Sequence, residues 1–325
     1  MRTSTASGIS YGALSARDGD VSFVPGPALV KIALLVLGAL LAAAALRRTP
    51  AHARHDLWLL VVTGTVVLGL AGLLLPAVYF TVPASWAPLA EPTRRGAELI
   101  GLVWAGGALV AALRFAAGLL ALRRIGVHAS ALGGPNAPDA LAAASRLAGL
   151  ARPVTLLVSA DVHVPVTWGV RRPVVALPAA AAQWSAERLR LVLLHELLHV
   201  RRRDVLVEFF LEAVTIAFWF HPAVWLAARQ LRLERERACD EAVLETGARA
   251  SEYCTHLVEI MGAAARGPGL VVGAGMAAPS TLEYRVRALL GEPRPRHSRL
   301  RGVVLTVCAL AIYGLGTLTP CVHGR

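Results

Sequence analysis

The sequence predicts a mostly helical membrane protein: four transmembrane helices and a cytoplasmic α+β domain with a small sheet and a membrane-associated helical hairpin. Composition is the first reason. Hydrophobic residues make up 56% of the chain, charged residues 17%, and the mean hydropathy is +0.57, whereas soluble proteins average about 25% charged residues. The second reason is a set of four long apolar runs, and the third is a segment of mixed polarity between the last two of them.

Four apolar runs account for most of this hydropathy. A transmembrane helix needs about 20 mostly apolar residues, and all four runs approach that length, the last one marginally. They cover residues 28–46, 57–80, 98–122 and 302–318. The first run begins too far into the chain for a cleaved signal peptide, and it has neither a basic segment before it nor a cleavage site close behind it. All four are therefore predicted to be membrane spans.

Arginine placement predicts the orientation, because cytoplasmic loops are enriched in basic residues. Arginines gather after the first run, at the end of the third and before the fourth, at positions 47, 48, 54, 123, 124, 294, 296, 299 and 301. The chain is therefore predicted to cross the cytoplasmic (inner) membrane several times. Its N-terminus is predicted to lie outside, and residues 125–300 are predicted to lie in the cytoplasm. Because the arginines flank apolar runs, the net charge of +12 fits the lipid bilayer and topology better than direct nucleic-acid binding.

These features divide the chain into five predicted parts. They are an extracytoplasmic tail over 1–27, three transmembrane helices over 28–124, a cytoplasmic domain over 125–265 with a membrane-associated hairpin at 207–229, a flexible juxtamembrane loop over 266–301, and a final transmembrane helix with a short tail over 302–325. The domain is where a folded site is expected, because it is the longest part with polar residues throughout.

Within the domain, composition predicts a linker, a helix and a small sheet in turn. Residues 129–138 are rich in Gly, Pro and Asn and read as a linker, and 139–150 read as a helix. Residues 152–178 are rich in Val and Thr, which predicts two or three short strands with a turn near Gly169. Ser185 is the predicted N-cap of the next helix.

The stretch LVLLHELLHVRRRD, residues 191–204, places two histidines and a glutamate on one apolar helix. His195 and His199 are four residues apart, so they share a helix face and both imidazoles can reach one metal ion. Glu196 can contact a water held by that ion and act as the catalytic base. The alternative is a structural helix whose two histidines make hydrogen bonds within the protein and bind no metal, because the pattern HExxH also occurs by chance.

Zinc in such a site needs a third protein ligand and an open position for water. The stretch LRLERERACDEAVLETG offers Glu236 and, one turn later, Asp240. This spacing is that of glutamate-type zinc peptidases, in which the aspartate holds a ligand histidine by its second ring nitrogen. Glu234 and Glu241 are the alternatives to Glu236, and a salt-bridged surface is the alternative for the whole run. We predict that His195, His199 and Glu236 bind Zn2+ and that Asp240 holds a ligand histidine by its second ring nitrogen.

Residues 207–229 resemble a fifth span, but a complete crossing is incompatible with the predicted site. It would put His199 and Glu236 on opposite sides of the membrane, about 30 Å apart. The chain is therefore predicted to turn back at His221-Pro222, because proline disrupts a helix. His221 is predicted to be a cap or turn residue, with a place near the metal as the alternative. A second oxyanion donor is also expected, for which His221 and Tyr253 are the candidates.

Several stretches together resemble the BlaR/MecR-type membrane zinc metallopeptidases. They are PVTWGVRRPVVALP, LVLLHELLHVRRRD, FWFHPAVW, ERERACDEAVL and, within the predicted spans, RHDLWLL at 54–60. The resemblance implies a glutamate-type zincin domain with zinc on His195, His199 and Glu236 and with Glu196 as the base. Those receptors carry an extracellular penicillin-binding sensor domain, which this chain, ending at Arg325, is expected to lack.

The resemblance further implies peptide hydrolysis in signal transduction. The expected protein substrate is a cytoplasmic transcriptional repressor or the chain's own juxtamembrane loop, over 266–296. Two alternatives stay open: a membrane signalling scaffold that binds without cutting, and a quality-control protease for membrane proteins with many substrates. Replacing Glu196 with Gln separates the first alternative from a peptidase, because a scaffold does not need the base.

Overall fold

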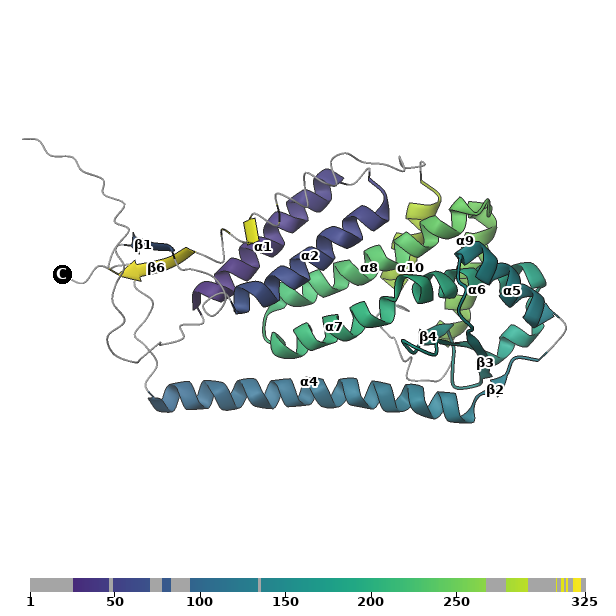
Figure 1. Ribbon diagram of the computed structural model, residues 1–325, viewed down its shortest axis with the longest axis horizontal. Coiled ribbons are helices and arrows are strands. Elements are labelled where there is room, and N and C mark those ends of the chain that lie inside the picture. The colour runs from purple at the N-terminus through teal and green to yellow at the C-terminus, as the bar shows by residue number, and fades with distance from the viewer. Residues whose placement is uncertain are drawn as a thin grey trace, which may run out of the picture.

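The computed structural model describes residues 26–46, 49–70, 78–82, 94–133, 136–266, 279–291, 308, 311–312, 314 and 318–322. The molecule is elongated, with a helical bundle at one end and a mixed α/β part at the other (Figure 1). The bundle consists of α1 (Gly26–Ala45), α2 (Ala51–Gly69), α7 (Asp204–Ala217) and α8 (Pro222–Glu245), with the long helix α4 (Arg94–His128) lying along one side.

The α/β part contains a four-stranded sheet and five helical segments. Its elements are β2 (Ser130–Ala131), α5 (Asn136–Ala148), β3 (Thr155–Ser159), β4 (Val166–Trp168), β5 (Val174–Pro178), the 3-10 helix η3 (Ala179–Gln183), α6 (Ala186–Arg202), α9 (Ala250–Arg266) and α10 (Pro279–Leu289). The strand order is β2-β3-β5-β4, in which β3 and β5 are parallel and the two outer strands antiparallel to their neighbours. The predicted small sheet in a mostly helical chain is confirmed.

The turn predicted near Gly169 lies directly after β4. Gly169 has a φ of 88°, and a Cβ atom there would lie 2.4 Å from the carbonyl oxygen of Arg172. Only glycine meets both conditions at little cost. This turn lets β4 fold back antiparallel onto β5, with Thr167 opposite Val175.

The apolar runs only partly coincide with helices. The run 57–80 was expected to be one span, but α2 covers Ala51–Gly69 and β1 (Val78–Val82) pairs in parallel with β6 (Leu318–Val322). Most of the run 302–318 lies outside the described residues. Among those that are described, one helix, Glu98–His128, is long and apolar enough to cross a membrane, and Leu29–Ala45 is a shorter apolar helix. Four transmembrane helices therefore stay a prediction.

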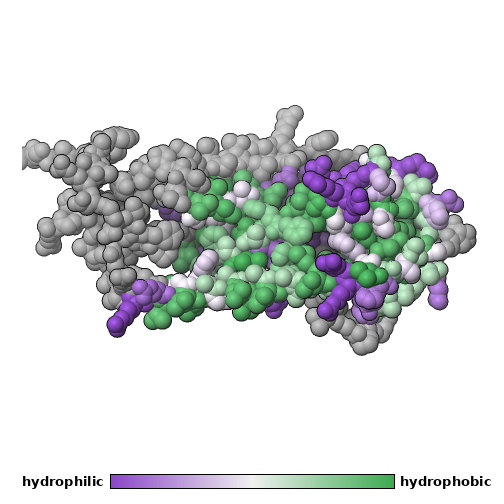
Figure 2. All heavy atoms as spheres, turned by 60° about the horizontal axis from the view of Figure 1, so that its bottom comes forward, coloured by the Kyte–Doolittle hydropathy of each residue, from purple (hydrophilic) through white to green (hydrophobic). Residues whose placement is uncertain are grey.

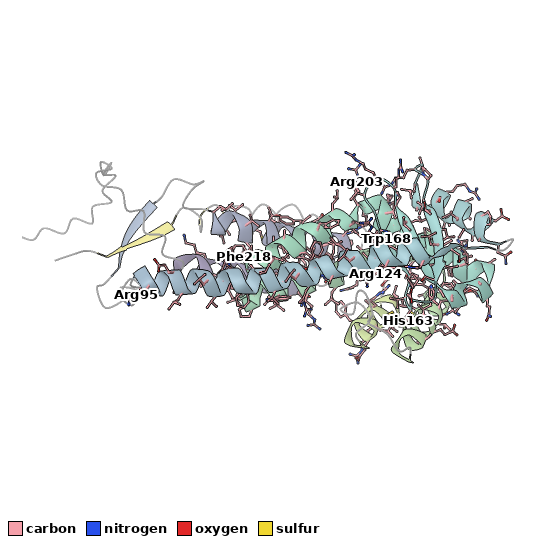
Figure 3. The ribbon with its side chains drawn as sticks, turned by 90° about the horizontal axis from the view of Figure 1, so that it is seen from below. Arg95, Arg124, His163, Trp168, Arg203 and Phe218 are labelled. Carbon is pink, nitrogen blue, oxygen red and sulfur yellow. The ribbon has the colours of Figure 1, made fainter. Side chains whose placement is uncertain are left out.

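Helix α4 differs from the other apolar helices in its exposure. None of its most apolar 18-residue window is buried, and side chains such as Leu102, Leu109 and Leu113 are more than half exposed. Figure 2, in which the side of the molecule with α4 is turned forward, shows hydrophobic residues across the middle of that side. Figure 3 shows Arg95 and Arg124 near opposite ends of the helix. Helix α2, in contrast, buries Leu57, Trp58 and other residues against α1 and α8.

Helices α7 and α8 form a hairpin whose turn contains the His221-Pro222 pair that was expected to reverse the chain. Pro222 is the first residue of α8, where its missing N–H leaves no helical bond unmade. The turn rests on α4 through indole N–H groups: Trp104 donates to the carbonyl of Ala217 at 3.0 Å, and Trp219 donates to the carbonyl of Trp104 at 3.1 Å. The carbonyl of Ala217 and the indole N–H of Trp219 therefore have partners on α4.

Within the segment 266–301, predicted to be a flexible loop, the structure contains helix α10. The expectation of a loop is wrong over these eleven residues. Leu289 of α10 is buried in the same core as α6 and α9, and Val286 packs against it. Tyr284 adds polar contacts, because its hydroxyl donates to Glu234 and accepts from Arg237. Spacing of apolar residues in this short segment is too weak a signal to predict that docking.

A buried ion pair joins two helices of the bundle. Arg54 of α2 and Glu234 of α8 are 3.0 Å apart, and their side chains are 3% and 4% exposed. Arg54 also donates to the carbonyl oxygens of Leu46 and Thr49, which lie at the end of α1 and in the turn that follows. The Glu234 carboxylate thus pairs with Arg54 and also accepts a hydrogen bond from the Tyr284 hydroxyl.

Replacing Arg54 with Ala should lower the free energy of unfolding by about 3–5 kcal/mol, because the Glu234 carboxylate is left buried without its cation. Chemical unfolding of the full chain in detergent micelles measures this loss. The double variant Arg54→Met/Glu234→Met should recover much of it, since both charges are then removed. A double variant as unstable as Arg54→Ala would contradict the role given to the ion pair.

Candidate metal centre

Helix α6 presents the predicted His195, Glu196 and His199. It begins at the predicted cap, where the Ser185 side chain accepts a hydrogen bond from the N–H of Arg188 at 3.2 Å. The helix is anchored by leucines that are buried in the core of the α/β part: Leu189, Leu191, Leu193, Leu194, Leu197 and Leu198. Its remaining face, which carries the two histidines, is turned toward α8.

His195, His199 and Glu236 converge on one point. The Nε2 atoms of the two histidines are 3.2 Å apart, and they lie 3.6 Å and 3.7 Å from different oxygens of Glu236. The candidate ligand atoms all lie within 4.8 Å of one another. Two imidazole nitrogens and a carboxylate oxygen form a donor set that Zn2+ accepts. The structure thus brings together the three residues predicted to bind metal.

Glu236 gives a direct test of whether these residues fit a metal ion. The side chain is 4% exposed, and its Oε1 atom is buried without a hydrogen-bond partner. A buried carboxylate oxygen without a partner is costly unless a cation satisfies it. The donor set and this oxygen together fit a divalent cation between the two helices.

Both histidines of the cluster are contacted at Nδ1, the ring nitrogen that faces away from the cluster. Asp240 Oδ1 lies 3.2 Å from Nδ1 of His195, as the spacing predicted, and the Tyr253 hydroxyl lies 2.9 Å from the same atom. Asp204 Oδ2 lies 2.7 Å from Nδ1 of His199. Such contacts leave each Nε2 free to face a metal and fix the ring orientation.

Asp204 was missed in the sequence, although it is the last residue of the stretch LVLLHELLHVRRRD. The reason is geometric. Helix α6 ends at Arg203, which has a left-handed φ of 58°, and this bend returns the first residue of α7 toward His199. A helical projection continued past Arg203 would have pointed Asp204 elsewhere.

Neither candidate for the second oxyanion donor faces the site as expected. Tyr253 contacts Nδ1 of His195, on the side of the ring opposite to Nε2. His221 lies at the start of α8, and its Nε2 is 3.1 Å from the carbonyl oxygen of Leu29 in α1. Fifteen residues of helix, about 22 Å, separate it from Glu236. These contacts support neither residue as the oxyanion donor, whereas the prediction that His221 is a cap or turn residue is confirmed.

Arg285 is a second residue that the sequence did not reveal. It comes from α10 and is 5% exposed. Its Nε and Nη2 atoms donate to the two oxygens of Asp240 at 2.8 Å and 2.7 Å, and Nη1 lies 3.5 Å from Glu236. This two-pronged ion pair fixes the carboxylate that in turn orients His195.

The electrostatics of the centre favour a cation. Burial lowers the pKa of His195, but hydrogen bonds to Asp240 and Glu236 outweigh burial and raise that pKa to about 9. Burial raises the pKa of Glu236, but the charge of His199, the hydrogen bond to His195 and the charge of Arg285 hold it well below its usual range. The carboxylates therefore stay ionised and attract positive charge to the space between the rings.

Glu196 lies beside this cluster and is 8% exposed. Its Oε2 atom accepts a hydrogen bond from the Thr167 hydroxyl of β4 at 2.6 Å. The predicted base thus lies between the histidine pair of its own helix and the outer strand of the sheet. General-base chemistry requires a carboxylate within hydrogen-bond reach of the attacking water.

Comparison with known proteins agrees with this geometry. The profile of the BlaR1 peptidase M56 family matches residues 27–289, most of the 325-residue chain. The chain belongs to the BlaR1 peptidase M56 family. The resemblance drawn from the sequence is thereby confirmed. In this peptidase family member, α6 and α8 supply the clustered His and Glu side chains.

Two relatives of this M56 family member are known regulatory or resistance proteins. The "Regulatory protein BlaR1" of Bacillus licheniformis is 44% identical over 82 residues, which are 25% of this chain and 14% of that protein. The "Methicillin resistance mecR1 protein" of Staphylococcus aureus is 25% identical over 93 residues, or 28% of this chain and 16% of that protein. The chain thus aligns with only a small part of each relative.

Replacing Arg285 with Gln should release α10 from the centre, because Asp240 loses a buried two-pronged ion pair whose loss costs about 3–5 kcal/mol. Amide hydrogen exchange of residues 279–289 in the full chain should become faster, and thermal unfolding should occur at lower temperature. Arg287→Gln is the matched control, since Arg287 lies on the same helix with its side chain 80% exposed. Equal exchange in the two variants would show that Arg285 does not hold α10.

Proposed function

We propose that this M56 family member is a membrane-embedded zinc metalloendopeptidase of the inner membrane. The observation that supports it most is the convergence of His195, His199 and Glu236 within 4.8 Å, with Glu196 adjacent to the cluster. His195, His199 and Glu236 would hold the zinc, and Asp240 and Asp204 would orient the two imidazoles. When bound, zinc supplies a Lewis acid that lowers the pKa of water to about 7 and polarises the scissile carbonyl.

Glu196 performs the proton transfers in this proposal. Its carboxylate takes a proton from the attacking water and delivers it to the nitrogen of the leaving amine. The short strand β4 lies at the edge of the sheet order β2-β3-β5-β4, so its outer side is placed to pair with an extended peptide. A purely structural role for this strand, as support for α6, is the competing explanation.

The membrane topology is also part of the proposal. Helix α4 is apolar, exposed and flanked by arginines, which fits contact with lipid. The hairpin of α7 and α8 accompanies it, and charged residues between these two helices pair with each other: Arg232 lies 2.6 Å from both Glu208 and Glu212, and Arg235 lies 2.5 Å from Glu208. Paired charges suit a hairpin at the membrane surface with its tip inserted. The peptidase domain would face the cytoplasm.

Regulated proteolysis is the biological role that we propose. The relatives carry the names of a regulatory protein and a methicillin resistance protein, which favours signal transduction. The substrate would be a cytoplasmic transcriptional repressor or the chain's own segment 266–296. Part of that segment, α10, contacts the candidate metal centre through Arg285 and Asp240, which favours the chain's own segment as one candidate substrate.

Zinc content tests the ligand set. The full chain purified in detergent should hold about one zinc, and so should Glu196→Gln, since a three-ligand site does not need the base. Glu236→Ala should lose most of the metal. Glu245→Ala, a change at the exposed end of the same helix α8, is the matched control and should keep it. Absence of metal from the folded wild type would refute the proposal.

Cleavage tests the enzyme. Blotting the full chain from both ends, under inducing conditions, should reveal fragments that depend on Glu196 and disappear in Glu196→Gln. Signalling should be lost in the same variant. Intact chain under every condition, together with normal signalling by Glu196→Gln, would instead support a scaffold that binds zinc or a repressor without cutting.

A further inference from the structure

We propose that Thr167 is a positioning residue for Glu196, an inference that rests on the proposed peptidase function. The Thr167 hydroxyl donates a hydrogen bond to Oε2 of Glu196 at 2.6 Å. It joins the outer strand of the sheet to the helix that carries both histidines. Hydrogen bonds from a hydroxyl to a carboxylate are short and roughly twice as strong as those between neutral groups.

A base in this position needs its carboxylate held in one orientation. A glutamate side chain has several rotatable bonds, and proton transfer requires an oxygen within hydrogen-bond reach of the water. The Thr167 hydroxyl occupies Oε2, which leaves Oε1 of Glu196 to accept the proton from water and later give it to the leaving nitrogen. Thr167 keeps its own proton throughout, so it contributes orientation without taking part in the transfer.

The strand that carries Thr167 is held by its neighbour β5 and by a side-chain contact with α4. Val175 of β5 pairs with Thr167 in the antiparallel ladder. The next residue, Trp168, packs with Ile125 of α4, and its ring would lie 3.5 Å from a Cβ at Gly126. Figure 3 shows Trp168 next to the end of α4 that carries Arg124. The hydroxyl is therefore placed by the sheet and by the long apolar helix together.

A structural role alone would not require a hydroxyl here. Valine has nearly the same shape as threonine and is equally suited to a strand, so Thr167→Val removes the hydrogen bond with little change in packing. Thr167→Ser keeps the hydroxyl and removes a methyl group. These two variants separate positioning of Glu196 from support of the strand.

The first test measures hydrolysis of fluorescein-labelled casein by the zinc-loaded full chain in detergent micelles. Thr167→Val should lower kcat by about tenfold to a hundredfold, the range expected for one hydrogen bond to a charged group, with KM and zinc content unchanged. Thr167→Ser should restore most of kcat. Wild-type kcat in Thr167→Val, or an equal loss in Thr167→Ser, would overturn the proposal.

The second test does not depend on activity. Thermal unfolding of the full chain without added metal is compared for wild type, Thr167→Val, Glu196→Ala and the double variant. Direct interaction predicts that the shifts in midpoint do not add, because each single change removes the same hydrogen bond. Additive shifts would overturn the contact, and with it the positioning role. Failure of the proposed peptidase function looks different: wild type would then hold no zinc and cleave no casein, whatever the Thr167 variants do.

Discussion

Convergence of side chains from two separate helices is the constraint on which the rest of the structure depends. His195 and His199 come from α6 and Glu236 comes from α8, and their ligand atoms lie within 4.8 Å. Between them the chain makes two helical passes of about 20 Å each, out along α7 and back along α8. The reversal at the start of α8 is therefore a condition for the site. The tryptophan contacts with α4 hold the turn where that condition is met.

The groups that support the centre come from different parts of the chain. Asp204 begins α7, Asp240 lies on α8, Tyr253 on α9 and Arg285 on α10. Each contacts His195 or His199, or the carboxylate that orients one of them. Buried polar networks of this kind are stabilising only when their members are satisfied. Here Arg285 contacts Asp240 and Glu236, and Arg235 lies 3.6 Å from Glu236, so two buried guanidinium groups offset the negative charge of the carboxylates.

Helix α8 belongs to the bundle and to the centre at once. On one side Glu234 pairs with Arg54 of α2, and Glu241 accepts a hydrogen bond from the N–H of Ala51 at 2.7 Å. On the other side Glu236 and Asp240 contact His195. Any displacement of α2 relative to the α/β part must therefore strain buried ionic contacts or move the helix that carries a candidate ligand. Strand β4 likewise links the centre to the long helix α4, because Thr167 contacts Glu196 and the next residue, Trp168, packs with Ile125.

The sequence by itself determined the chemistry and the local elements. The i, i+4 histidines, the Glu236 and Asp240 spacing, the Ser185 cap and the turn at Gly169 depend on interactions within a few residues, so pattern and propensity can reveal them. Only the tertiary structure decided which distant groups support them. Asp204 reaches the centre from the start of α7, and Thr167 reaches it from the outer strand β4. Tyr253 and Arg285 reach it from α9 and α10, two helices that pack against the α/β core. Their contacts are specified by packing across the fold, which no local period in the sequence records.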